Sequence, residues 1–156
     1  MYDLIKLLHL TAAIVWMGGM TFMVFALRPA GLAVLDPQTR ARLMEQVWRR
    51  FFAMVLGAIA VLFATGTHLY TSAFKASKLA NGAGAVPLGL TLMLVFGVLM
   101  MLVFGHIYFA GFAKFKRAVA AAEWPAAAKA AGQIQKLVMV NFVLGWAAIA
   151  ALRLVY

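Results

Sequence analysis

Four long runs of apolar residues, separated by shorter polar segments, divide the chain. The runs cover residues 4–27, 51–74, 86–112 and 138–154. Their lengths are close to or above the ~20 residues that a helix needs to cross a hydrocarbon core of ~30 Å. The pattern therefore predicts an all-α integral membrane protein, a four-helix bundle in which residues 1–156 form a single domain.

The segments between the runs carry the turn signals. Segment 29–50 opens with Pro29-Ala-Gly and contains Asp36-Pro37, which predicts a turn and then a basic helix from about Gln38 into the second span. Segment 75–85 is small and Gly-rich, which is typical of an exposed loop. Segment 113–136 is rich in Ala and Lys and is helical by propensity, with a break at Trp124-Pro125.

Charge gives the chain an orientation. The formal net charge is +10, and 66% of the residues are hydrophobic. Most basic residues flank the first and third connectors, which places these connectors in the cytoplasm by the positive-inside rule. We therefore expect a multi-pass protein of the bacterial inner membrane with both termini periplasmic. Its cations then face membrane lipid, with no role for nucleic acid. The first span is too long for a signal-peptide core, so we expect it to be retained.

Composition excludes several kinds of chemistry. The chain has no cysteine, which removes disulfides, thiolate metal sites, iron–sulfur clusters and covalently attached haem. Its four acidic residues lie at the ends or in connectors: Asp3, Asp36, Glu45 and Glu123. The sequence has no carboxylate pair or nucleophile–histidine–acid set for hydrolysis, and no acid within a span for proton-coupled transport.

A histidine lies inside each of the first three runs. Imidazole within a bilayer is costly and points to a functional site. Antiparallel spans place His9 and His68 at a similar depth near the outer face, whereas His106 lies near the cytoplasmic end of the third span. At 100° per residue, the face of His9 carries soft or small residues: Ala13, Trp16, Met20 and Met23. The face of His68 carries small residues: Ala64, Val61 and Gly57.

A haem iron fits this arrangement. Two neutral imidazoles on antiparallel spans predict a bis-histidine b-type haem held by His9 and His68. Small residues leave room for a flat ligand or let another helix approach closely, and both interpretations stand. The pocket would be formed by Trp16, Gly57 and Ala64. At the membrane edge, Lys6 and Arg153 either pair with the propionates or serve as snorkelling anchors.

The predicted function is then that of a cytochrome b, namely electron transfer or a small redox reaction near the outer face. If the protein is an enzyme, we expect a membrane haem oxidoreductase; the sequence leaves open whether it is one. The redox partner is a quinone or another redox protein, and the sequence does not choose between them. Faces rich in Gly and Ala permit a homodimer.

Copper is the alternative metal. Met17, Met20 and Met23 recur at intervals of three, and thioethers suit Cu(I), although methionine is also an ordinary gap-filler in apolar packing. His106 is a ligand in an iron or copper site with methionines of the inner half, or else it is hydrogen-bonded to a neighbour such as Asn141. The competing functions are therefore copper handling and a purely structural role.

The opening of the chain, His9-Leu-Thr-Ala-Ala-Ile-Val-Trp-Met-Gly-Gly, resembles that of copper-resistance protein D (CopD)-like membrane domains. Arg28-Pro29, Arg49-Arg50-Phe and Ala64-Thr-Gly-Thr-His68 are also similar to that group. The first span in addition resembles that of HemJ-type protoporphyrinogen oxidases, which implies haem ligation through His9 and porphyrinogen oxidation as a further candidate function. The third span begins Val86-Pro-Leu-Gly-Leu-Thr and lacks the His-x-Lys-like element of HemJ proteins.

Overall fold

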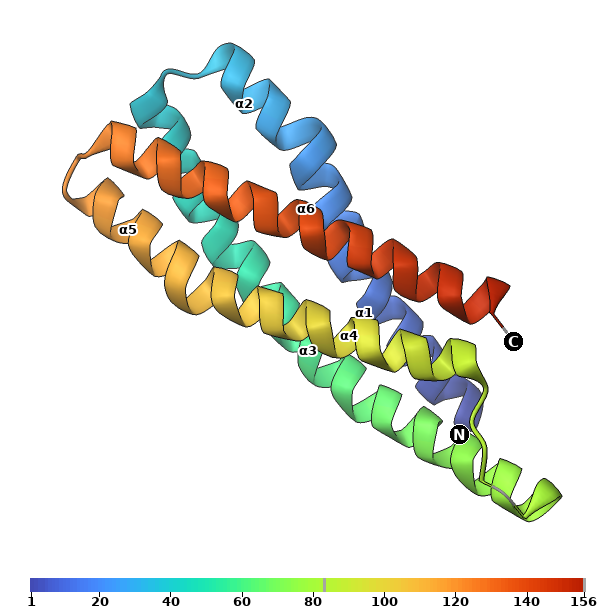
Figure 1. The fold of residues 1–156 in the computed structure, drawn as a ribbon. Coiled ribbons are helices and arrows are strands. Elements are labelled where there is room, and N and C mark those ends of the chain that lie inside the picture. Colours follow the sequence, from blue (N-terminus) through green and yellow to red (C-terminus); the bar gives the residue numbers. More distant parts are fainter. Residues whose placement is uncertain (83, 156) are drawn as a thin grey trace.

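In the computed structural model, which describes residues 1–82 and 84–155, the chain forms four long helical rods (Figure 1). The first rod joins α1 (Tyr2–Phe22), the π-helical segment η1 (Met23–Leu27) and α2 (Arg28–Val34). The second is α3 (Pro37–Asn81). The third joins α4 (Leu88–His106), η2 (Ile107–Phe112) and α5 (Ala113–Ala120), and the fourth is α6 (Trp124–Leu154). Each rod is long and apolar enough to cross a membrane, so the predicted all-α membrane bundle is confirmed.

The rods are longer than the predicted spans, because the basic connectors continue the helices. The predicted turn at Pro29 is wrong, since Pro29 lies in the first turn of α2 within an unbroken rod. A proline ring clashes with the carbonyl one turn before it. Here η1 directly precedes α2, and its wider π-helical turn accommodates that proline without a break. The segment after Phe74 is likewise helical as far as Asn81.

The chain turns at three places, each within a segment for which a turn, a loop or a break was predicted. The extended residue Asp36 caps α3, its carboxylate accepting a hydrogen bond from the Thr39 N–H at 3.0 Å, so the predicted helix start near Gln38 is confirmed. Gly82 ends α3 with a positive φ of 70°, which glycine adopts without strain. The predicted break at Trp124-Pro125 is confirmed as well, because α6 begins there after a turn at Ala121–Ala122.

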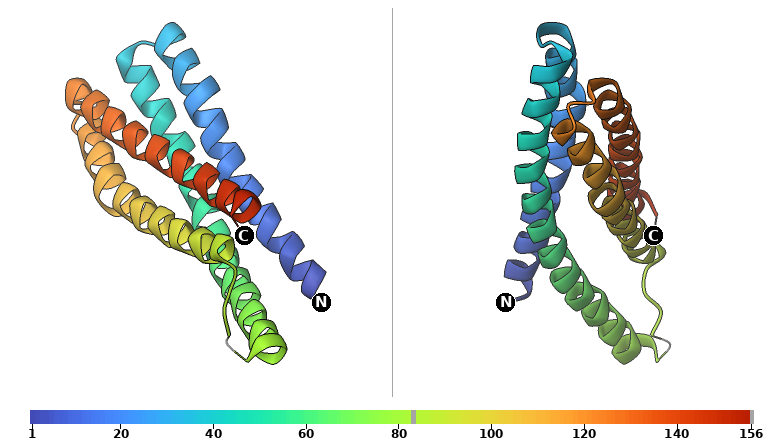
Figure 2. Two further views of the ribbon diagram at one scale, coloured as in Figure 1. Left: turned by 45° about the vertical axis from the view of Figure 1, so that its right-hand side comes forward. Right: turned by 90° about the vertical axis from the view of Figure 1, so that its left-hand side faces the viewer.

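The four rods form two antiparallel pairs. The α1–α2 rod packs mainly on α3, and α4 packs mainly on α6. Figure 2 shows the two pairs close together at one end and splayed at the other. We call the end with the α2–α3 and α5–α6 connections the basic end. The opposite end, with both termini and the α3–α4 connection, is the open end (Figure 2). Both termini thus share one side, as predicted, while the compartment they face stays a prediction.

The packed core lies toward the basic end. An aromatic cluster joins α3 to the α4–α5 rod there, with Trp48 stacked on Phe52 and edge-on to Phe115. Toward the open end, none of the described side chains of α3 beyond Thr65 is buried. Large apolar side chains such as Phe63 and Phe109 are exposed on the outside, as expected for surfaces in contact with lipid. The open end is therefore the less tightly packed half of the bundle.

Candidate functional site

His9 is held against α3 by a hydrogen bond. Its Nδ1 lies 2.8 Å from the Thr65 hydroxyl oxygen, and that hydroxyl lies 2.6 Å from the Val61 carbonyl oxygen. The hydroxyl has one hydrogen, which it donates to Val61 in the usual bond of a helical threonine to the preceding turn. His9 must then donate its Nδ1–H to Thr65. The imidazole is thereby fixed as the tautomer whose Nε2 carries a free lone pair.

The local sequence explains why the ring fits there. On α1, Trp16, Met20 and Met23 of the predicted face are buried, whereas Ala13 is only partly buried and its neighbour Ala12 is buried instead. On α3, Gly66 offers no side chain, and a Cβ at this position would lie 3.2 Å from the His9 Cε1. The absence of a Cβ lets α1 and α3 approach closely at the level of His9. The ring therefore occupies the space between the two helices.

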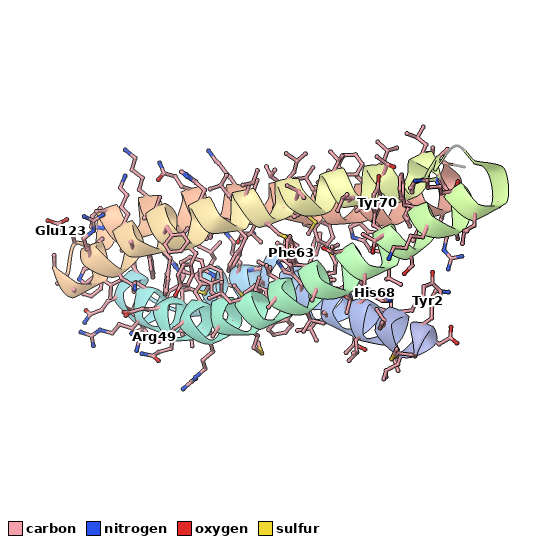
Figure 3. All side chains as sticks on the ribbon, turned by 90° about the horizontal axis from the view of Figure 1, so that it is seen from below. Tyr2, Arg49, Phe63, His68, Tyr70 and Glu123 are labelled. Carbon is pink, nitrogen blue, oxygen red and sulfur yellow. The ribbon has the colours of Figure 1, made fainter. Side chains whose placement is uncertain are left out.

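His68 lies one turn beyond Thr65 but on a different face of α3. His9 contacts Thr65, three residues before His68, so the predicted similar depth of the two histidines agrees with the fold. Figure 3 shows His68 at the same end of the bundle as Tyr2. Its side chain is exposed, as are the other members of its predicted stripe, Ala64, Val61 and Gly57. The haem pocket predicted from Gly57 and Ala64 requires this stripe to face the bundle interior, and that prediction is wrong. Gly57 and Val61 instead line a shallow groove between α1 and α3 on the outside of the bundle.

The remaining residues of the predicted haem pocket are dispersed. Trp16 is buried in the core, where it contacts Phe104 edge-on at 6.1 Å between ring centroids. The Lys6 ammonium lies 4.4 Å from the centre of the Tyr2 ring on its own helix. Arg153 is exposed in the last turn of α6. Lys6 and Arg153 thus occupy the open end, at the level where membrane anchors are expected, and their pairing with a ligand stays a prediction.

His106 does not contact Asn141 in the manner predicted. Asn141 is buried and donates its Nδ2–H to the Met100 carbonyl at 3.2 Å, while its Oδ1 has no partner among the described residues. Since α4 and α6 are antiparallel, the residues of α6 level with His106 precede Asn141 by about one turn. His106 itself is exposed. The hydrogen-bonded alternative for His106 is therefore wrong, and its role as a ligand stays a prediction.

Several methionines of the predicted soft-donor series face the interior. Met20 and Met23 are buried in α1. Met17 reaches Gly145 of α6, and the Met100 methyl group from α4 approaches the same glycine. Thioethers from two helices thus converge one turn of α6 away from Asn141. Within residues 1–82 and 84–155, no group of three or more His, Asp or Glu side chains is arranged to hold a metal ion.

Sequence reasoning missed Thr65 and Gly66, which position the imidazole of His9. Both belong to the quoted segment Ala64-Thr-Gly-Thr-His68, where only Ala64 and His68 were assigned roles. The signal that would have found Thr65 is its spacing from the core residues of α3. Val55, Ala58 and Thr65 recur at helical intervals on the buried face.

The fold and these buried side chains define a class of protein: a multi-pass membrane bundle of four helices with a polar, imidazole-bearing contact between α1 and α3. A family model described as Copper resistance protein D (CopD) matches residues 45–155. The chain belongs to the copper resistance protein D family. The match begins in α3 and runs to the end of α6, so it contains Thr65 and lies beyond His9. No curated protein and no solved structure matches the chain significantly.

Proposed function

We propose that this protein is a copper-handling membrane protein that binds Cu(I) as its substrate, with His9 as the first ligand at the open end. Membership of the copper resistance protein D family supports copper as the metal. Copper is cargo in this proposal, and the chain supplies the donor atoms that receive it.

The observation that carries the proposal is the orientation of His9. Metal-binding histidines in proteins almost always donate the N–H of their second ring nitrogen to a fixed acceptor, which sets the tautomer and the direction of the ring. The 2.8 Å contact with the Thr65 hydroxyl supplies such an acceptor. The bond leaves Nε2 as the neutral imidazole donor that suits copper.

The buried methionines supply a second group of donors deeper in the bundle, since Met17 lies about 12 Å beyond His9 along α1 at 1.5 Å per residue. Thioethers are soft ligands that favour Cu(I) over divalent ions with oxygen preferences. Met17, Met20 and Met23 follow His9 along the inner side of α1, and Met100 of α4 meets Met17 at Gly145. These residues lie deeper in the bundle than His9, which is only partly buried. The imidazole is thus placed to receive the ion and the thioethers to hold it further in.

Competition for Cu(I) tests this proposal. The purified protein, in detergent without oxygen, is titrated against a chromogenic Cu(I) chelator. We expect His9→Ala to weaken binding by more than the roughly 10–100-fold seen when only the hydrogen-bond partner of a ligand is removed. Met17→Leu, which keeps the side-chain volume and removes the sulfur, should weaken it as well. His106→Ala should leave the affinity unchanged, because His106 is exposed on another rod.

Two results would overturn the proposal. One is a wild-type protein that competes no better than a bundle in which His9, Met17 and Met20 are all replaced. The other is equal affinity of wild type and His9→Ala while His106→Ala loses the metal, which would move the site to the basic half of the bundle.

A b-type haem is the second candidate, because the free Nε2 of His9 also suits haem iron. A haem held between His9 and His68 does not fit this arrangement. The His9 ring already fills the space between α1 and α3 beside Gly66, and His68 is exposed on another face of α3. The absorption spectrum of the purified protein separates the two candidates. A Soret band with sharp reduced α and β bands favours haem, whereas a colourless preparation that retains copper favours copper handling.

A further inference from the structure

A pocket at the basic end lies between α2, the first turns of α3, α5 and α6, far from His9. Figure 1 shows these elements gathered at the end of the bundle opposite to the chain termini. The cavity measures about 130 Å³. Small residues leave this space open. At Gly132 of α6, no atom apart from the adjacent backbone of its own helix lies within 4 Å of the position that a Cβ would take.

The polar groups of this pocket are hydrogen-bond donors or amides. Arg28, Arg40 and the buried Gln135 are the residues of its lining that carry such groups, and no aspartate or glutamate lines the cavity. Arg40 makes one long bond, 3.4 Å, to the Leu35 carbonyl, which leaves most of its donors available. A cavity lined by cationic donors without carboxylates selects a ligand with negatively charged oxygen atoms.

At the wall of this pocket, Trp48 adds a buried hydrogen-bond donor without a partner in the described part of the chain. It lines the pocket, is only 2% exposed, and its indole N–H has no hydrogen-bond partner among the described residues. Stacking on Phe52 and the edge contact with Phe115 hold the indole in place. A buried donor without an acceptor costs about 1–3 kcal/mol. The indole nitrogen itself has almost no accessible surface, so an acceptor in the pocket would remove that cost once the indole shifts toward it.

The lining of the pocket indicates which kind of molecule carries the acceptor oxygen atoms. Most lining residues are apolar, and Leu32 and Leu43 at the rim are exposed. The cavity has room for a headgroup-sized ligand and no more, so a longer apolar body must leave across the rim. Basic pockets between membrane helices are known binding sites for acidic lipid headgroups.

We propose that this pocket binds the phosphate group of an anionic phospholipid, with the acyl chains passing over Leu32 and Leu43. The phosphate oxygens accept hydrogen bonds from Arg28, Arg40 and the Trp48 indole. The site is separate from the copper site and does not depend on the proposed function.

The test uses the full-length protein in a non-ionic detergent. Short-chain phosphatidylglycerol, phosphatidylcholine and inorganic phosphate are added in separate arms, and binding is measured by the shift in thermal unfolding and by lipid retention in native mass spectrometry. We expect a saturable stabilisation by phosphatidylglycerol only. Equal stabilisation by inorganic phosphate would overturn the lipid assignment in favour of a soluble anion. Equal stabilisation by phosphatidylcholine would show a general effect of lipid and would overturn the proposed site for an anionic headgroup.

Three variants locate the effect. Arg40→Gln removes one charged donor and Trp48→Phe removes the indole N–H while keeping an aromatic ring; each should weaken lipid binding by about tenfold. Gly132→Leu fills the cavity and should abolish binding. Gly97→Leu is the matched control, because Gly97 also has free space around its Cβ position but lies on α4, outside the pocket. Unchanged phosphatidylglycerol binding in Arg40→Gln and Trp48→Phe would refute the proposal even if Gly132→Leu fails to fold.

Discussion

Thr65→Val isolates the contribution of one hydroxyl to the proposed copper site. Valine keeps the shape of threonine and removes the acceptor that fixes His9. Loss of such a partner usually costs 10–100-fold in metal affinity, which corresponds to about 1.4–2.8 kcal/mol. The fold should lose less, because a hydrogen bond between membrane helices is worth roughly 0.6 kcal/mol on average. The affinity for Cu(I) should therefore fall more than the stability of the bundle.

The matched control is Thr67→Val. Thr67 lies two residues further on the exposed side of α3 and makes the same bond to the preceding turn, 2.8 Å to the Phe63 carbonyl. Thr65→Ser, which keeps the hydroxyl, should restore the affinity. Chelator competition gives the Cu(I) affinity and thermal unfolding gives the stability of each variant. If Thr65→Val and Thr67→Val bind Cu(I) equally well, the tautomer argument for His9 is refuted.

Three further outcomes follow from other parts of the molecule. Gly89→Ala should destabilise the bundle by about 1–3 kcal/mol in thermal unfolding, because the new Cβ would meet backbone carbonyl oxygens at the end of α6. The control Gly97→Ala has free space around the new Cβ and should be neutral or slightly stabilising. Equal effects of the two substitutions would contradict this packing. The hydrogen bond from Thr39 holds the pKa of the Asp36 carboxyl below its ordinary value. The stability that this bond contributes is therefore present above the pKa of the unfolded chain and is lost as the pH falls through the pKa of the folded protein. Asp36→Asn, which keeps a capping oxygen, should lose that acid dependence in a pH series of unfolding curves, and an unchanged dependence would assign it to another group. Single cysteines at Ala85 and Ala121 should be labelled from the periplasmic and cytoplasmic sides respectively, and the reverse result would invert the predicted orientation.

The four membrane rods could be predicted because hydropathy is a direct signal of a membrane span. Their true ends could not. Segments 28–34 and 75–81 are polar or mixed, yet both extend helices that are already formed, and extension costs far less than starting a new helix. Pro29 looked like a stop because the compensating π-helical turn just before it leaves no mark in the hydropathy pattern.

The inward face of α1 could also be predicted, because Trp16 and Met20 share it with His9. The face of α3 was misjudged for a physical reason. In lipid, the side that packs on protein and the side that meets acyl chains are both apolar, so hydropathy does not separate them. The stripe of His68 was read as interior, although Thr65, only three residues earlier and about 60° away around the helix, marks the side that meets α1.

The two proposed sites lie far apart along α3, which makes their independence testable. Thr65 and Arg40 are about 38 Å apart along the helix at 1.5 Å per residue. Effects of substitutions at such a distance usually add. The double variant Thr65→Val/Arg40→Gln should therefore show the Cu(I) affinity of Thr65→Val and the phosphatidylglycerol affinity of Arg40→Gln. A double variant whose Cu(I) affinity falls further when the lipid is withheld would show coupling between the ends. Since the two helix pairs are tightly packed only at the basic end, such coupling would mean that lipid binding sets how far the open end splays.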